Sequence, residues 1–458
     1  MNTKHTVSKV FDVMLRATLL WLVGGALWGS SLAGAGTEVP APGSANRLTL
    51  RDCTRMAFAH SPLLKASAQN QTISRETVGE ARGSYYPTLG IRGGVSRWQS
   101  HAFLPSGFSS PNLSSTVGPT DDWSAGGFAR YMLYDGGVRR AGLEAQKAME
   151  SGVALDSESI RLDVVYDVHQ AFYQVAVALE LRTVASHSLS SVEAHLGIAK
   201  NRQAAGDTTE ADVLRTQVEV DNAKAELIRT ESLIRIAKGD LNAVMGLPAE
   251  MPVDIDSDQA ALSCPADMNI TNLLEQAIRT RPEIAAAQSA IAASHQQVQA
   301  VKSAFKPKIY ADGSYGRRDD SASLEDEAWF AGISVELTVF EGFSTQHKLT
   351  RARAEVVKTE VGLERISLIV RKEVWAACAR VQEARELVKA TITQVHNAEE
   401  SMRLMAARYQ AGAGTVTDLL DVQTSLTAAE ARHVQARWNC QQAQSSLGRA
   451  TGTLTGEE

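Results

Sequence analysis

Two aspartates in the C-terminal part of the chain come nearest, by type and spacing, to a chemical site. Asp418 and Asp421 lie three positions apart, so on a helix their carboxylates share one face. A carboxylate pair can serve acid–base chemistry, but no nucleophile stands at a fixed spacing from this one. The alternative is that acidic residues near a helix N-terminus favour the helix dipole. The elements that carry the pair must decide between these roles.

Other kinds of catalytic or cofactor chemistry have little support in the sequence. The ten histidines are scattered without an HExxH pattern, and no GxxxxGK[ST] phosphate loop is present. No grouping of serine, histidine and aspartate, or of cysteine and histidine, stands out as a nucleophilic site. We therefore expect no enzyme activity, no cofactor and no resident metal ion.

The cysteines are not spaced as metal ligands. Cys378 lies four residues after Val374 and three before Val381, which is the spacing of a buried helix face and predicts a buried thiol. A disulfide is the alternative. The four cysteines are Cys53, Cys264, Cys378 and Cys440.

The aspartate pair belongs to a sequence that occurs twice. RQAAGDTTEADVLRTQ and, 206 residues later, RYQAGAGTVTDLLDVQ match at seven of sixteen positions. In each copy a glycine, Gly206 or Gly412, can take the left-handed conformation that ends a helix. The threonines that follow, Thr208-Thr209 and Thr415, can cap the next helix. Both segments are therefore predicted to be turns of helical hairpins.

The helices joined by these turns are predicted to be very long. No proline occurs between Pro119 and Pro248 or after Pro307, so 141–205 and 347–409 can each continue as one helix. At 1.5 Å per residue, each would span roughly 100 Å. Such helices need partner helices along their length, because their apolar stripe is thin. In the first, that stripe alternates steps of three and four through Val165, Val168, Phe172, Val175 and Leu179.

Four shorter segments have the period-two alternation of strands: 86–98, 123–134, 308–317 and 328–340. Strands of this length with one apolar and one polar face are typical of a membrane β-barrel, although a soluble antiparallel sheet with one wet face has the same rhythm. Four strands cannot close a barrel alone, so several chains would have to share one. Three copies would supply twelve strands.

The duplication extends beyond the turns. The offset of 206 relates Asp135-Gly136 to Glu341-Gly342, and an offset of 220 relates Pro62 to Pro282. Each copy reads helix, strand, loop, strand, long helix, turn and helix. We expect a signal peptide over 1–35, a first structural repeat over 36–256 and a second over 257–458.

The first 35 residues have the composition of a secretory signal. Basic residues precede an apolar run over 17–28, and Ala33-Gly34-Ala35 is a small-residue cleavage site.

Removing 1–35 takes away three basic residues and one acidic residue, and lowers the net charge from −6 to −8. That charge argues against a nucleic-acid partner. No other stretch has 18 consecutive apolar residues, so the exported chain would be secreted, periplasmic or placed in an outer membrane.

From about Leu48 to Gly452 this layout resembles the outer-membrane efflux proteins of the TolC family. The family shares the Asp/Glu-Gly pair after the second and fourth strands, and a Tyr-x-x-Gly stretch followed by two aspartates. The resemblance implies a mainly α fold with a small β part, built from internally duplicated long α-helical hairpins and four strands per chain. It further implies a homotrimer in the outer membrane, with a 12-stranded β-barrel continuous with a periplasmic α-helical barrel. The residues that carry the second motif are Tyr409, Gly412, Asp418 and Asp421.

The resemblance also assigns roles at the turns. It places Asp418 and Asp421 in rings inside the closed mouth, where six carboxylates would favour cations and could capture a multivalent metal ion without catalysis. It pairs Tyr409 with Asp212 on the neighbouring hairpin as a gate hydrogen bond.

A second family latch is expected to be missing. It uses an arginine where this chain has Gly414, and the usual partner position holds Ala211. Arg408 and Arg215 are nearby candidates for a substitute. The expected docking points for a periplasmic adaptor are the turn glycines, Gly206 and Gly412.

The function implied is the outer-membrane exit duct of a tripartite export system. A periplasmic membrane-fusion adaptor would join it to an inner-membrane ABC transporter or proton-driven pump. The cargo would be a protein, by type I secretion, or small toxic molecules, and the missing latch slightly favours protein. The alternative is a structural periplasmic coiled-coil or adaptor protein without a channel of its own. An adaptor normally carries one hairpin within β domains, not two duplicated units.

Overall fold

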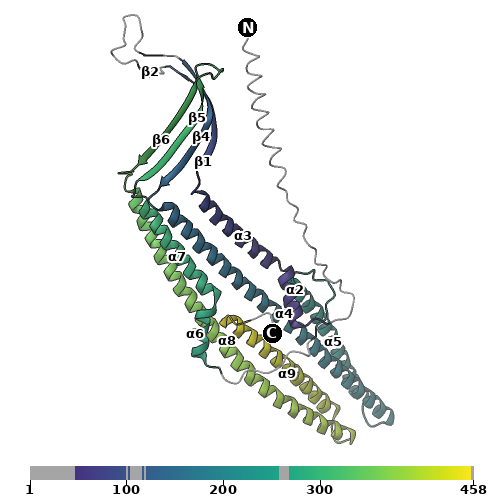
Figure 1. Ribbon diagram of the computed structural model, residues 1–458. Coiled ribbons are helices and arrows are strands. Elements are labelled where there is room, and N and C mark those ends of the chain that lie inside the picture. The colour runs from purple at the N-terminus through teal and green to yellow at the C-terminus, as the bar shows by residue number, and fades with distance from the viewer. Residues whose placement is uncertain (1–46, 100–101, 104–115, 118–119, 257–267, 455–458) are drawn as a thin grey trace, which may run out of the picture. The chain divides into compact units, whose positions relative to one another are not determined.

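The two halves of the chain share the order helix, helix, strand, strand, helix, helix, and the first half adds the two short strands β2 and β3 (Figure 1). The computed structural model describes residues 47–99, 102–103, 116–117, 120–256 and 268–454, so the predicted signal peptide lies outside the described residues. The first half contains α2 (Leu50–His60), α3 (Pro62–Gly83), β1 (Thr88–Trp98), β2 (Ala102–Phe103), β3 (Thr116–Val117), β4 (Thr120–Tyr134), α4 (Val138–Ala205) and α5 (Glu210–Met245). The second half contains α6 (Ile270–Thr280), α7 (Pro282–Ser303), β5 (Lys308–Asp319), β6 (Glu327–Glu336), α8 (Ser344–Gln410) and α9 (Val416–Thr451).

The two longest helices follow from the absence of proline. α4 has 68 residues and α8 has 67, and each begins three residues earlier than the sequence predicted. Pro62 and Pro282 instead stand at the first positions of α3 and α7, where a missing N–H breaks no helical hydrogen bond.

The Asp-Gly pair after β4 forms the tight turn that connects this strand to α4. The Asp135 carboxylate accepts hydrogen bonds from the backbone N–H groups of Gly137, at 2.9 Å, and Arg139, at 2.7 Å. Gly136 has φ 71°, and an added Cβ there would lie 2.7 Å from the Ser303 carbonyl oxygen, so only glycine fits. The family motif at this position is therefore a helix cap on a tight turn.

One antiparallel sheet joins the halves in the order β1-β4-β5-β6, with the central pairing between β4 and β5. The last pair of β5 and β6 is Lys308 with Glu336. The prediction that the fourth strand reaches Phe340 is therefore wrong. Pro307 precedes β5 and has no N–H to donate, so the ladder cannot continue.

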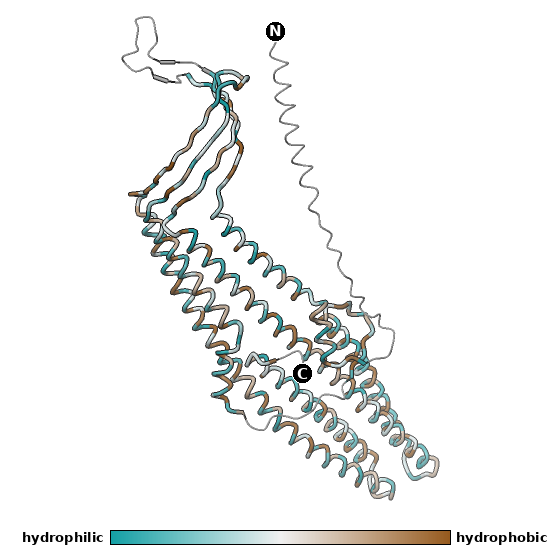
Figure 2. Tube along the Cα trace, viewed as in Figure 1, coloured by the Kyte–Doolittle hydropathy of each residue, from teal (hydrophilic) through white to brown (hydrophobic). Residues whose placement is uncertain are grey.

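Hydrophilic and hydrophobic residues alternate along the strands (Figure 2). On the polar face, Arg130 Nε donates to Asp312 Oδ1 at 2.6 Å, and Ser334 Oγ donates to the same carboxylate. Large apolar side chains of the other face are also exposed, Ile91 at 91% and Ile333 at 72%. Within the described part of the chain, the sheet therefore lacks a covering layer.

The long helices pair as two antiparallel hairpins, α4 with α5 and α8 with α9, and α4 also packs along α9. The largest buried cluster lies where α2, α4, α5 and α9 meet, and the Tyr173 and Trp438 ring centroids are 5.7 Å apart there. Among the described helices, none is apolar enough over sufficient length to cross a membrane.

The buried thiol predicted at Cys378 is confirmed. Cys378 packs with Val374 between α6, α7, α8 and α9, and Cys53 is a second buried free thiol. Cys440 is disulfide-bonded, which is the alternative that the sequence left open. Cys264 lies outside the described residues.

Candidate functional site at the hairpin turns

The two repeated segments form the turns of the two hairpins, as predicted. Gly206 ends α4 with φ 81°, and its N–H donates to the Gln203 carbonyl at 3.0 Å. Gly412 follows α8 with φ 76°, and its N–H donates to the Tyr409 carbonyl at 3.1 Å. Both glycines therefore close the preceding helix through a left-handed residue.

Each following helix starts with a capping box. Thr415 Oγ1 accepts from the Asp418 N–H at 3.2 Å, while the Asp418 carboxylate accepts from the Thr415 N–H at 3.2 Å. Thr209 and Asp212 repeat the arrangement at the start of α5. The sequence signal was the repeated Thr-x-x-Asp, in which only the threonine was predicted to cap the helix.

Capping accounts for part of the chemistry of Asp418. Hydrogen bonds from the Thr415 hydroxyl, then from its N–H, lower the pKa of the Asp418 carboxyl below its ordinary value. The side chain therefore stays charged near neutral pH.

Asp418 and Asp421 share the exposed side of α9, as their spacing predicted. Leu419 and Leu420 between them are 1% and 5% exposed and face the core of the hairpin tips. The two carboxylates thus project from a helix that is packed on its opposite side. This geometry permits them to line a water-filled space.

The predicted gate partners are engaged differently in this chain. Asp212 accepts hydrogen bonds from the hydroxyls of Thr208 and Thr209, both at 2.8 Å. Tyr409 is 3% exposed, and its buried hydroxyl has no hydrogen-bond partner among the described residues. The hydrogen bond between Tyr409 and Asp212 remains a prediction.

Arg202 lies between the two tips, and sequence reasoning missed it. Its Nη1 donates to the Tyr409 carbonyl oxygen at 2.8 Å, and its Cζ lies 4.9 Å from the centroid of the Tyr409 ring. Arg408 holds the equivalent place in the repeat, and its Nη2 donates within its own turn, to the Ala413 carbonyl at 3.3 Å. The repeat itself was the signal, since it places an arginine in the last turn of both long helices.

A small apolar core joins the tips beneath these polar groups. It draws residues from all four long helices, so neither tip is a separate unit. Its buried members are Val192, Leu196, Val220, Tyr409, Val416, Leu419 and Leu420.

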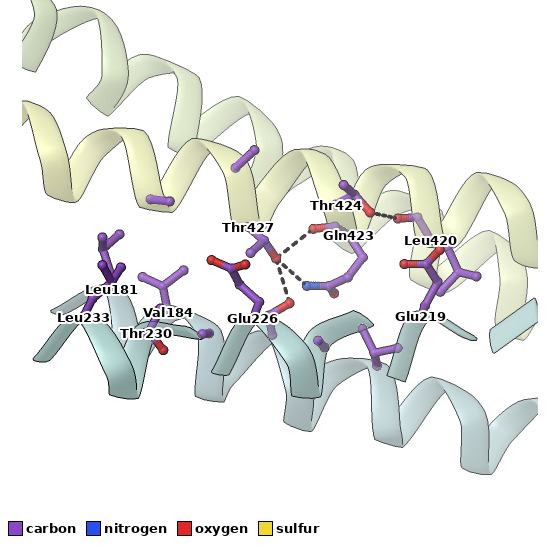
Figure 3. Close-up of a pocket in the computed structure, with 16 residues that line it drawn as sticks. Leu181, Val184, Glu219, Glu226, Thr230, Leu233, Leu420, Gln423, Thr424 and Thr427 are labelled. Atoms are coloured by element: carbon purple, nitrogen blue, oxygen red, sulfur yellow. Dashed lines mark hydrogen bonds between the residues drawn. The ribbon is translucent and has the colours of Figure 1, made fainter. Parts of the chain in front are cut away.

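Behind the tips, an open groove of about 350 Å³ runs between α5 and α9 over α4 (Figure 3). Its lining is mostly apolar, and the carboxylates of Glu219 and Glu226 belong to it. The hydroxyls of Thr427 on α9 and Ser188 on α4 lie 3.0 Å apart, which joins the two hairpins along this groove.

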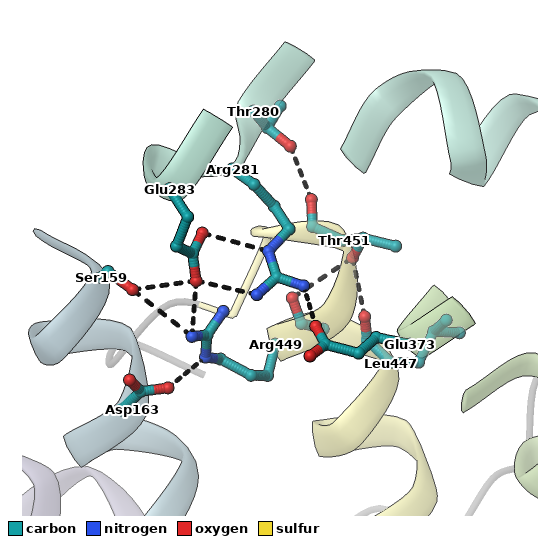
Figure 4. A network of polar contacts seen from close by, with 10 residues as sticks. Ser159, Asp163, Thr280, Arg281, Glu283, Glu373, Leu447, Arg449 and Thr451 are labelled. Atoms are coloured by element: carbon teal, nitrogen blue, oxygen red, sulfur yellow. Dashed lines mark hydrogen bonds and ion pairs between the residues drawn. The ribbon is translucent and has the colours of Figure 1, made fainter. Parts of the chain in front are cut away.

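Farther from the turns, a partly buried ionic network joins α4 to helices of the second half (Figure 4). Glu283 Oε1 accepts from Arg281 Nη2 and from Arg449 Nη2, each at 2.8 Å. Burial opposes the charge on Glu283, but hydrogen bonds from both arginines outweigh it and hold its pKa well below the ordinary value. Arg281 also pairs with Glu373 of α8, and Arg449 with Asp163 of α4. The network fixes the α6–α7 junction to three long helices.

A family model described as outer membrane efflux protein matches residues 54–247 and 273–453, which is most of the chain. The chain belongs to the outer membrane efflux protein family. It is therefore an outer-membrane protein extending into the periplasm, from a family of channel proteins of tripartite export systems. The resemblance drawn from the sequence is confirmed.

Individual relatives are distant but align over most of their length. Protein CyaE of Bordetella pertussis is 26% identical, with 86% of this chain and 82% of the relative covered. The pyoverdine export outer membrane protein OpmQ of Pseudomonas aeruginosa is also 26% identical, covering 80% of this chain and 77% of OpmQ. The crystal structure of the outer membrane protein VceC from Vibrio cholerae superposes with a TM-score of 0.74 at 19% identity, covering 88% and 96% of the two chains. The predicted fold class is thereby confirmed.

Proposed function

We propose that three copies of this outer membrane efflux protein form a gated exit duct of a tripartite export system. The four strands of each copy would close a common twelve-stranded barrel, and the hairpins would continue it as a helical duct into the periplasm. A periplasmic membrane-fusion adaptor would join the duct to an inner-membrane ABC transporter or proton-driven pump. In this proposal 1–35 is the signal peptide, and 36–256 and 257–458 are the two repeats.

The sheet is the observation that carries the proposal. β1 pairs with β4 alone and β6 with β5 alone, so within the described residues the outer edge of each terminal strand has no partner. The apolar face of the sheet is also exposed, with Leu89, Trp329 and Val335 between 67% and 75% exposed. A four-stranded sheet with two open edges and a bare apolar face is not stable in water by itself. Lipid on that face and further copies at both edges would complete it.

The hairpin tips are the proposed gate. Asp418 and Asp421 project from the unpacked side of α9, so three copies would place six carboxylates around the mouth. Such a ring would attract cations, repel anions and hold a multivalent metal ion as a blocking ligand. Gly206 and Gly412 are the proposed contacts for the adaptor hairpin. An added Cβ at Gly206 would meet no atom within 4 Å, so the turn leaves close approach open there.

The proposed cargo is a protein, by type I secretion, or small toxic molecules. The name of OpmQ assigns pyoverdine export to that protein, which supports a small-molecule cargo for a family member. Gly414 stands where the family has a latch arginine, and a closed end without that latch would open more readily. This supports a protein cargo. Deleting the gene and measuring both secreted protein and resistance to toxic compounds separates the two.

Planar-bilayer recording of the purified protein tests the duct. We expect small, cation-selective conductance that trivalent metal ions block from the side of the tips. The double change Asp418→Asn with Asp421→Asn should weaken both selectivity and block, while an amide oxygen at 418 can still cap α9. Thr415→Ala is the control for capping alone and should retain selectivity. Unchanged selectivity in the double variant would remove the carboxylates from the pore.

The oligomeric state and fractionation separate the duct from the alternative of a structural periplasmic protein. A duct requires trimers in mild detergent and recovery with outer membranes. A monomer recovered with soluble periplasmic proteins would favour the structural alternative.

A further inference from the structure

We propose that Arg202 is a positioning residue that ties the two hairpin tips of one chain together and holds the mouth narrow at rest. This inference rests on the proposed duct and adds the element that would compensate for its missing arginine latch. It concerns one chain, because every contact that supports it lies between the first and second hairpins of the same protomer.

The tie consists of two contacts made by one guanidinium. Arg202 stands in the last turn of α4, and Tyr409 in the last turn of α8. The hydrogen bond from Nη1 to the Tyr409 carbonyl measures 2.8 Å, and the ring of the same residue lies 4.9 Å from Cζ. Nη2 would lie 3.8 Å from a Cβ added at Gly412, so the guanidinium lies over the turn itself.

Both contacts are favourable for a cation in this place. The last carbonyls of a helix lack helical partners and carry the negative end of its dipole, so the end of α8 attracts positive charge. A hydrogen bond from a charged donor is stronger than one between neutral groups. The face of an aromatic ring attracts a guanidinium as well, more strongly where water is excluded, and the Tyr409 ring is buried.

The repeat provides a comparison within the same molecule. Arg408 is the equivalent of Arg202 at the offset of 206, in the last turn of α8. The equivalent of Tyr409 is Gln203, which has no ring to receive a cation. Arg408 is hydrogen-bonded to Ala413, in its own turn. Thus two arginines with the same local setting differ in one respect, since only Arg202 bonds the other hairpin.

The position of the tie explains how it would act on a gate. The tip core beneath it contains residues of all four long helices, so moving one tip away from the other exposes apolar surface and breaks both contacts of Arg202. Asp418 is the third residue of the helix that follows the Tyr409 turn, so a displaced second tip would carry the proposed carboxylate ring with it. Losing a charge-assisted hydrogen bond and a ring contact should shift the equilibrium for tip separation about tenfold.

Single-channel recording with matched variants tests the tie. Arg202→Met keeps an apolar stem but removes the charge and the donors, and should raise the resting open probability about tenfold. Arg408→Met is the matched control and should leave it unchanged. Arg202→Lys should restore part of the closure, because an ammonium can still donate to the carbonyl. Equal resting open probability in wild type and Arg202→Met, or equal effects of the two methionine variants on it, would overturn the inference.

Hydrogen exchange on the purified protein tests the tie without relying on channel activity. Arg202→Met should speed amide exchange about tenfold in the last turns of both α4 and α8. Arg408→Met should affect only the turn after α8. Unchanged exchange at the α8 tip in Arg202→Met would refute the tie even where the protein conducts. Absent wild-type conductance combined with the expected exchange pattern would refute the duct and retain the tie.

Discussion

Removing the charge of Glu283 is expected to lower the free energy of local unfolding where α6 and α7 join the long helices. The loss should be greater than for removing the charge of an exposed glutamate. Glu283 lies between two arginines, the buried Arg281 at 5% and the half-buried Arg449 at 14% exposed. Glu283→Gln keeps the size of the side chain but leaves one carboxylate fewer for two cations. Each arginine retains a single acidic partner, Glu373 for Arg281 and Asp163 for Arg449.

The magnitude follows from that residual pairing. Leaving a buried charge without its partner costs about 3 to 5 kcal/mol. Here both arginines keep one carboxylate, and the amide oxygen can still accept a hydrogen bond, so we expect a loss of about 2 to 3 kcal/mol. The effect should concentrate where α6 and α7 join α4, α8 and α9, because those are the elements that the network holds together.

Native-state hydrogen exchange in mild detergent is the suitable assay, because it reports the opening free energy of each segment. Amides of α7 near Glu283 should exchange faster in Glu283→Gln, while those near the hairpin tips should not change. Glu386→Gln is the matched control, since Glu386 is exposed and pairs with Lys389 on the same helix. Similar exchange in both variants would show that the network adds no net stability.

The same reasoning gives a pH dependence for this network. The pKa of Glu283 is lower in the folded chain than in the unfolded chain. Its contribution is therefore present above the ordinary pKa of a glutamate and is lost as the pH falls toward the folded value. Urea unfolding should show a shallower acid dependence in Glu283→Gln than in wild type. Identical pH profiles would contradict the assignment.

Three further predictions follow from the described contacts. Burial lowers the pKa of His169 to about 4, so stability should fall as the pH drops from 6.5 toward 4, and His169→Gln should flatten that part of a urea-unfolding profile. Thr415→Ala should destabilise the start of α9 by about 1 kcal/mol, measured as faster amide exchange in its first turn, with Thr209→Ala acting likewise on α5. Tyr409→Phe should leave resting conductance unchanged if the Arg202 contacts hold the tips, because the ring and carbonyl remain. A clear increase would instead support the hydroxyl link predicted from the family.

Several features of the fold could be predicted because they depend on one or two residues acting locally. Proline cannot occupy a helix interior, so the two proline-free stretches indicated α4 and α8 to within three residues at their starts. A glycine before a threonine is enough to end one helix and cap the next. The end of β6 could not be predicted this way, because a strand stops where its partner stops, and the partner lies elsewhere in the chain.

At the candidate site, too, local features could be predicted from the sequence and contacts between distant segments could not. From the sequence alone came the duplicated turns, the shared face of Asp418 and Asp421, and the family to which the chain belongs. Only the tertiary structure decided which arginine reaches across the tips. Arg202 and Arg408 occupy equivalent places in the repeat, and their helices give them the same local setting. They differ in the residues that surround them in the folded chain, since α4 ends beside the buried ring of Tyr409. Tyr409 is 207 positions from Arg202, so no local sequence pattern predicts the contact.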